Sequence, residues 1–304
     1  MKKIAVTGST GLVGKKLIQT AIGLGYEITS ISRNTKKSLD LFGKNISHVM
    51  WDGVNISPEL YELFAQCDGI FHLAGASINQ SWSNKNKSII TSSRESGTLQ
   101  IRTALHSINY RGFFFSASAI GYYGDCGDNL VTEQSGVGND FLAKVCDLWE
   151  SASGFSNNPF RTVVGRIGIV LSIESGALAE TLLPFKLGFG GPLGSGNQWW
   201  SWIHINDLVH TLLYFFENNR CSGIYNITAP EPVQMKVFAK TLGKVLHRPS
   251  FFKVPAILLK FVLGERAIIV LNSQKIDNSR LIGDGYTFKF NKLNAALQDL
   301  LLKL

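Results

Sequence analysis

The fold class of this chain is decided by the stretch Lys3-Ile4-Ala5-Val6-Thr7-Gly8-Ser9-Thr10-Gly11-Leu12-Val13-Gly14. Residues 3–7 form a short apolar run typical of a buried strand, and residues 12–24 carry apolar side chains at helical spacing. Glycines between them let a pyrophosphate approach the backbone N–H groups at a helix N-terminus, where a β-carbon would clash. The alternative is a purely structural glycine-rich turn. Because the glycines lie between a strand and a helix, we expect a dinucleotide to be bound by Gly8, Ser9, Thr10, Gly11, Leu12, Val13 and Gly14.

Strand and helix signals alternate beyond this stretch. Residues 26–32 and 69–74 are typical of strands, and residues 58–66 of a short helix. Further strands are expected within the ranges 112–116, 162–171 and 223–227. Strands that alternate with helices predict an α/β fold, here a Rossmann-type doubly wound parallel sheet with helices on both faces.

The end of the second expected strand indicates which dinucleotide binds. An acidic residue at this point would hydrogen-bond the ribose 2′-OH of NAD, but this chain has Ser32 and Arg33, followed by Lys36 and Lys37. A guanidinium suits a 2′-phosphate, which a carboxylate would repel. The two lysines are also compatible with ordinary solvated charges. We therefore predict NADP(H), with NAD(H) as the less favoured cofactor.

Composition excludes several classes of protein. Of the 304 residues, 45% are hydrophobic and 17% charged, which is typical of a globular chain. No apolar run reaches the roughly 18 residues of a membrane span, and the N-terminal run is too short for a signal peptide. The four cysteines are widely spaced, which predicts reduced thiols rather than a disulfide frame or a zinc site. We expect a cytoplasmic protein without a metal site.

The net charge of +8 lies almost wholly in the last quarter of the chain, where residues 231–304 contribute +7. Basic domains can bind nucleic acid or anionic membranes. Lys236, Lys240 and Lys244, however, form one stripe of an amphipathic helix whose other side is apolar, which is typical of a solvated helix face. Residues 251–271 have the apolar bulk of a substrate lid or a partner surface. We expect neither nucleic acid nor membrane as a partner.

Several further motifs show a resemblance that spans nearly the whole chain. They are Thr7 to Gly14, Asp68 to Gly75, Ser93-Arg94, Ser116-Ala117-Ser118-Ala119, Asp140 to Ala143, Trp149-Glu150, Leu183-Pro184-Phe185, Gly188 to His204 and Trp202 to Asp207. In these the chain resembles the extended short-chain dehydrogenase/reductases, the NAD-dependent epimerase/dehydratase superfamily. It is most similar to an atypical branch labelled epimerase family protein, which carries a C-terminal domain of unknown function.

The resemblance implies a Rossmann domain for the cofactor and a smaller, mainly helical C-terminal domain on the substrate side. Residues 1–170 and 198–229 would form the first domain, and residues 171–197 and 230–304 the second. It also implies that Leu73, Ala74 and Gly75 line the cofactor. Arg94 would reach a cofactor phosphate, or else be an ordinary helix-surface charge.

The catalytic pattern of this superfamily is incomplete in the chain. Its usual proton donor is the tyrosine of a Tyr-x-x-x-Lys motif, aided by a serine, and none of the eight tyrosines has a lysine four residues later. Three interpretations stay open. Tyr122 or Tyr123, just past Ser118, supplies the phenol; Asp140 acts as acid or base with Lys144; or the site performs no chemistry. We prefer Tyr122 beside Ser118.

The substrate pattern also departs from the superfamily. Nucleotide-sugar epimerases carry an arginine just before the aromatic-Ile-His segment, and this chain has tryptophans there. A nucleotide sugar is therefore disfavoured. Candidate substrate contacts are Tyr123, Trp200, Trp202 and His204, although the tryptophans could equally pack the domain junction.

Together these observations predict an NADP(H)-binding oxidoreductase or epimerase-like enzyme that acts on an unidentified small molecule. The alternative is a non-catalytic NADP(H)-binding sensor that regulates a partner protein. The sequence leaves the oligomeric state open, a homodimer included.

Overall fold

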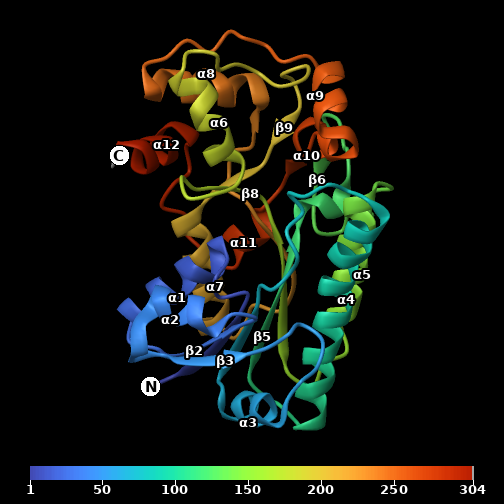
Figure 1. The fold of residues 1–304 in the computed structure, drawn as a ribbon, viewed down its shortest axis with the longest axis vertical. Coiled ribbons are helices and arrows are strands. Elements are labelled where there is room, and N and C mark those ends of the chain that lie inside the picture. The colour runs from blue at the N-terminus through green and yellow to red at the C-terminus, as the bar shows by residue number, and fades with distance from the viewer. Residues whose placement is uncertain (303–304) are drawn as a thin grey trace. The chain divides into compact units, whose positions relative to one another are not determined.

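The computed structural model describes residues 1–302 (Figure 1). It contains two compact units. The first consists of residues 1–119, 144–166 and 209–225, and the second of residues 120–143, 167–208 and 226–304. Each unit is described by itself below. The domain limits expected from the sequence stay a prediction.

A seven-stranded sheet organises the first unit. In sheet order its strands are β11 (Gly223–Ile227), β7 (Arg161–Ile167), β5 (Phe113–Ala119), β4 (Gly69–His72), β1 (Lys3–Thr7), β2 (Glu27–Ser32) and β3 (Ser47–Met50). β1 pairs in parallel with β2 and β4, β2 with β3, and β4 with β5. The fold is the predicted Rossmann-type α/β architecture.

Helices cover both faces of this sheet because neighbouring side chains of a strand point to opposite faces. Ile70 of β4 is buried in a cluster with Leu60 and Phe64, whereas Phe71 packs its ring 6.0 Å from Phe216. The helices that carry residues of this unit are α1 (Leu12–Gly23), α2 (Thr35–Phe42), α3 (Pro58–Gln66), α4 (Asn84–Ser107), α5 (Phe141–Ser153) and α7 (Ile205–Glu217). α4 and α5 lie side by side (Figure 1), and the Arg94 guanidinium lies 5.0 Å from the centre of the Trp149 ring.

The second unit is built from short strands and helices. β8 (Ile169–Leu171) pairs in parallel with β10 (Trp202–His204), β6 (Leu130–Val131) in parallel with β13 (Lys275–Ile276), and β9 (Trp199–Trp200) antiparallel to β12 (Val233–Gln234). Its helices are α6 (Ala177–Lys186), α8 (Met235–Leu246), α9 (Ala256–Leu263), α10 (Ile268–Leu271), α11 (Ser279–Gly283) and α12 (Leu293–Leu301), with 3₁₀ turns at Ile120–Tyr123 and Gly264–Ala267.

Most expected elements are confirmed. The helix over residues 58–66 and the strand over residues 223–227 have the predicted bounds. α8 buries Phe238 and Leu242 and exposes its lysine stripe, as its pattern predicts. The strand expected over residues 162–171 is interrupted at Gly168, where a Cβ atom would lie 2.5 Å from the Ser201 carbonyl oxygen.

Within residues 1–302, no helix combines the length and the apolar character that crossing a membrane requires.

Candidate functional site

The glycine turn between β1 and α1 has the close packing that its sequence predicts. Gly8 has φ +67°, a conformation that favours glycine, and a Cβ atom there would lie 2.7 Å from the Leu73 carbonyl group. A Cβ atom at Gly14 would lie 2.4 Å from the Gly8 oxygen. Gly11 begins α1 without a side-chain cap, so the first-turn N–H groups remain available to an anion. The turn therefore fits a pyrophosphate.

Two buried serines connect this turn to the end of β2. The Ser9 hydroxyl donates to the Ile31 carbonyl oxygen at 3.1 Å, and the Ser30 hydroxyl donates to Ser9 Oγ at 2.8 Å. The side chain of Arg33, just after β2, is exposed and has no hydrogen-bond or ion-pair partner in the described part of the chain. A free guanidinium at this strand end fits a 2′-phosphate.

The end of β4 is held by a chain of hydrogen bonds that the sequence reasoning missed. His72 Nδ1 lies 2.7 Å from Thr7 Oγ1, and its Nε2 lies 3.0 Å from Thr98 Oγ1. Thr7 Oγ1 also accepts the N–H groups of Leu73 and Ala74 at 3.2 and 3.3 Å. Burial lowers the pKa of His72 to about 3, so the ring is neutral at pH 7. This chain of contacts positions the residues expected to line the cofactor.

Arg94 lies against this same segment rather than on an open helix surface. Its Nη1 donates to the carbonyl oxygens of Ala76 and Ile90 at 3.0 and 3.1 Å. A Cβ atom on Gly75 would lie 3.1 Å from the Arg94 Cζ atom. Burial lowers the pKa of the guanidinium. A residue larger than glycine at position 75 would therefore press against the Arg94 side chain.

Ser118 belongs to a buried polar triad. Its hydroxyl donates to Glu150 Oε1 at 2.6 Å, and Arg166 binds the same carboxylate through Nε at 2.8 Å and Nη2 at 2.7 Å. All three side chains are buried. The bidentate pair fixes the carboxylate, and the carboxylate in turn fixes the serine hydroxyl. Sequence spacing could not reveal Glu150 and Arg166 as its partners.

The two neighbouring tyrosines differ in accessibility. Tyr123 is buried, and its hydroxyl donates to Asn226 Oδ1 at 2.7 Å. Tyr122 is half-buried, with its ring edge-on to Tyr123 at 5.4 Å. Both belong to the second unit, whereas Ser118 belongs to the first. Of the two phenols, Tyr122 is the more accessible.

Asp140 has a structural position at the start of α5. Its Oδ1 accepts the Ala143 N–H at 2.9 Å, which is a helix N-cap, and its Oδ2 accepts the Asn272 side-chain N–H at 2.8 Å. Lys144 is exposed. These contacts favour a structural role for Asp140, which joins the start of α5 to Asn272, over an acid–base role.

The residues expected to contact substrate at the end of the Gly-rich stretch are buried inside the second unit. The Trp200 ring packs 5.0 Å from Phe238, and Trp202 Nε1 donates to the Glu231 carbonyl oxygen at 2.9 Å. His204 stacks on Phe290 at 4.0 Å, and its Nε2 lies 3.5 Å from Asp299 Oδ2. These contacts favour packing over substrate binding for all three.

Two family models and several relatives match this chain. The NAD dependent epimerase/dehydratase family matches residues 4–140, and a domain of unknown function (DUF1731) matches residues 254–300. An epimerase family protein of Staphylococcus aureus is 35% identical over 100% of both chains. One of Staphylococcus haemolyticus is 36% identical over 99% of both.

Solved structures agree with the sequence relatives. The human epimerase family protein SDR39U1, crystallised with NADPH, is 31% identical with a TM-score of 0.89, covering 99% of this chain and 100% of that one. A UDP-glucuronic acid 4-epimerase of Bacillus cereus, at 18% identity, TM-score 0.78 and coverage of 98% of this chain and 97% of that one, shares the fold. The chain therefore belongs to the NAD-dependent epimerase/dehydratase family, in the branch of the epimerase family proteins that carry this C-terminal domain.

Proposed function

We propose that the protein is an NADP(H)-dependent oxidoreductase or epimerase-like enzyme that acts on a small molecule other than a nucleotide sugar. The observation that carries the proposal is the tightly packed glycine turn, with the free guanidinium of Arg33 after β2. The NADPH complex of human SDR39U1 supports this choice of cofactor.

Residues of the first unit would hold the cofactor. The N–H groups after Gly8 and Gly11 would bind the pyrophosphate, and Arg33 the 2′-phosphate. The segment from Leu73 to Gly75, with Arg94 beside it, would form the wall along the dinucleotide. When bound, the nicotinamide donates or accepts the hydride.

The proton would come from Tyr122, which is half-buried and therefore more accessible than the buried Tyr123. Ser118 donates its only hydroxyl proton to Glu150 and also contacts the Cys146 side chain, and its oxygen has two lone pairs with which to accept hydrogen bonds. In this role Ser118 would orient the hydroxyl group of a substrate alcohol.

The proposal is tested by NADPH oxidation across a panel of small ketones and aldehydes. General acid catalysis contributes at least about 100-fold to a rate. Tyr122→Phe should therefore lower kcat by about 100-fold while NADPH binding stays unchanged. Tyr61→Phe, on helix α3, is the matched control and should retain full activity.

A second function rests on the position of Asp140. Because this carboxylate caps α5 and no tyrosine is followed by lysine at the usual spacing, a non-catalytic NADP(H) sensor is the alternative. It predicts tight NADPH binding without turnover on any panel member. Turnover that survives Tyr122→Phe would contradict the role of the phenol, and turnover of any kind would contradict the sensor.

A further inference from the structure

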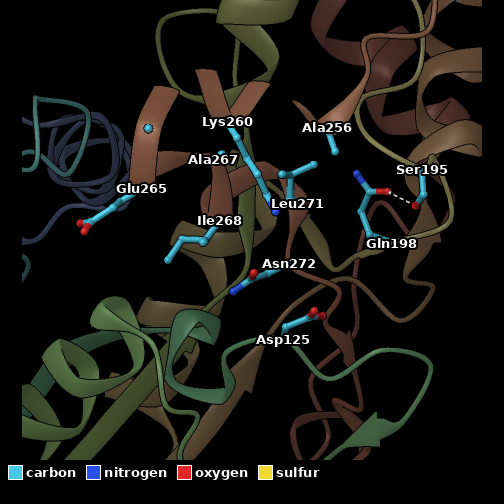
Figure 2. A pocket seen from close by; sticks show the side chains of 11 residues that line it. Asp125, Ser195, Gln198, Ala256, Lys260, Glu265, Ala267, Ile268, Leu271 and Asn272 are labelled. Atoms are coloured by element: carbon cyan, nitrogen blue, oxygen red, sulfur yellow. Dashed lines mark hydrogen bonds between the residues drawn. The ribbon is translucent and has the colours of Figure 1, made fainter. Parts of the chain in front are cut away.

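The second unit contains a cavity of about 540 Å³ whose lining mixes polar and apolar side chains (Figure 2). Small-molecule sites typically have volumes of about 300–1,000 Å³. The residues that matter below are Asp125, Gln198, Lys260, Ile268, Leu271 and Asn272. Every lining residue belongs to the second unit, so the cavity is complete within it.

Lys260 is the only cation in the lining. It projects from α9, and Figure 2 shows its side chain reaching into the cavity toward Leu271 and Asn272. Within residues 1–302 its ammonium group has no hydrogen-bond or ion-pair partner. An exposed ammonium that lines a cavity without such a partner can receive an anion.

The polar side of the cavity is connected to the loop that carries Tyr122. The Asp125 Oδ1 atom accepts the N–H of Ser273 at 2.9 Å, and the Gln274 side chain donates to the carbonyl oxygens of Ile120 and Gly124 at 3.0 and 2.9 Å. The 3₁₀ turn at Ile120–Tyr123 is therefore held by the residues that follow Asn272.

Asn272 adds one free acceptor to this side. Its amide nitrogen donates to Asp140 at 2.8 Å, so the amide oxygen remains free to accept a hydrogen bond from a ligand hydroxyl. Ile268 and Leu271 supply an apolar surface. The cavity thus offers a cation, an acceptor and an apolar wall to one small molecule.

The charges in the lining restrict the anion that fits. Asp125 and Glu265 also line the cavity, so the lining carries one cation and two carboxylates. Each further negative charge on a ligand adds repulsion from these carboxylates, so a monoanionic carboxylate beside Lys260 is favoured over a dianionic phosphate or a diphosphate.

We propose that this cavity is the substrate site and that it takes a small hydroxy- or keto-carboxylic acid. Lys260 binds the carboxylate, Ile268 and Leu271 contact the apolar body, and Asn272 accepts from a hydroxyl. The assignment as a substrate site rests on the proposed NADP(H)-linked function. The binding of a carboxylate in the cavity does not depend on it, because all lining residues lie in the second unit.

The test is calorimetric titration of the full-length protein, without cofactor, with three probes that share a phenyl body. Phenylpyruvate carries a carboxylate, phenylacetone is its neutral analogue, and phenyl phosphate carries the dianion. A hydrogen bond to a charged group contributes enough free energy for about a tenfold change in affinity. Lys260→Met should therefore weaken phenylpyruvate binding about tenfold, and Lys260→Arg should retain it. Lys253→Met, which removes an exposed lysine outside the lining, should behave as wild type.

The proposal requires wild-type protein to prefer phenylpyruvate to both other probes. Absence of phenylpyruvate binding, equal binding of phenylacetone, tighter binding of phenyl phosphate, or full affinity in Lys260→Met would each overturn it. A separate NADPH titration of the same proteins tests the proposed function. Loss of NADPH binding alone would contradict that function and leave the carboxylate site standing.

Discussion

At the scale of single residues, buried polar groups define the cofactor side of the first unit. Thr7, His72 and Thr98 form one hydrogen-bonded chain, and Ser118 and Arg166 share the carboxylate of Glu150. Such groups are costly to bury without partners, and here each has one. They hold the ends of β4 and β5, where the chain leaves the sheet.

His72 makes the stability of the protein depend on pH. Its folded-state pKa is about 3, below the unfolded value of about 6.5, so the unfolded chain takes up the proton first as the pH falls. This destabilising contribution of His72 to the free energy of unfolding is absent above about pH 6.5, and it grows as the pH falls toward the folded-state pKa. One proton lowers the free energy of unfolding by about 1.4 kcal/mol per pH unit in this window.

Urea unfolding between about pH 7 and about pH 4.5 measures this slope. The variant His72→Gln keeps a side chain that both donates and accepts hydrogen bonds. It should reduce the slope of the free energy of unfolding against pH by the amount that one proton contributes, about 1.4 kcal/mol per pH unit. Exposed His210→Gln serves as the control and should leave it unchanged. Identical slopes in wild type and His72→Gln would show that His72 does not carry this dependence.

At the scale of elements, local patterns predicted well where the stabilising contacts are local. Ser57 caps α3 and Pro58 occupies its first turn, so the bounds of this helix could be read directly. The strand–turn–helix unit at the N-terminus could be predicted from its sequence in the same way. β3 and α2 were not foreseen, since their polar residues conceal the pattern.

Candidate site residues were harder to predict because their partners are distant in the sequence. An acid–base role for Asp140 was one of three open interpretations, and its contact with Asn272 could not be foreseen because the two residues are 132 positions apart. Lys260 lies in residues 251–271, whose apolar bulk suggested a substrate lid or a partner surface, but its place in a cavity depends on how α9 packs beside Asn272. Trp200 and Trp202 suggested either a ligand or the packing of the domain junction, and both side chains are buried in the structure.

Loss of an aromatic ring should destabilise the protein far more in helix α8 than in helix α9. Phe261 of α9 is 87% exposed, whereas Phe238 of α8 is completely buried against Trp200. Phe261→Ser should change the free energy of unfolding by less than about 0.5 kcal/mol. Phe238→Ala should cost about 3–5 kcal/mol, because it leaves a cavity. Urea unfolding followed by tryptophan fluorescence compares the two, and a large loss for Phe261→Ser would show that α9 is covered in solution.

At the scale of the whole molecule, the chain divides the expected chemistry between two units. The first holds the glycine turn, Arg33 and Ser118, and the second holds Tyr122 and the cavity with Lys260. The excess positive charge of the sequence lies mainly in residues 231–304, and one lysine of this range, the exposed Lys260, lines the cavity. Cofactor binding and carboxylate binding can therefore be measured as separate properties.

The central claim is that the first unit selects NADP(H) through Arg33. The direct measurement is parallel titration of wild-type, Arg33→Ala and Arg220→Ala protein with NADPH and NADH, followed by cofactor fluorescence. Arg220 is an exposed arginine on a loop after α7 and serves as the control. Wild type and Arg220→Ala should bind NADPH at least about tenfold more tightly than NADH, because a guanidinium–phosphate contact is a strong charge-assisted one. Arg33→Ala should lose that preference. Equal affinity of wild type for the two cofactors, or an undiminished preference in Arg33→Ala, would contradict the account.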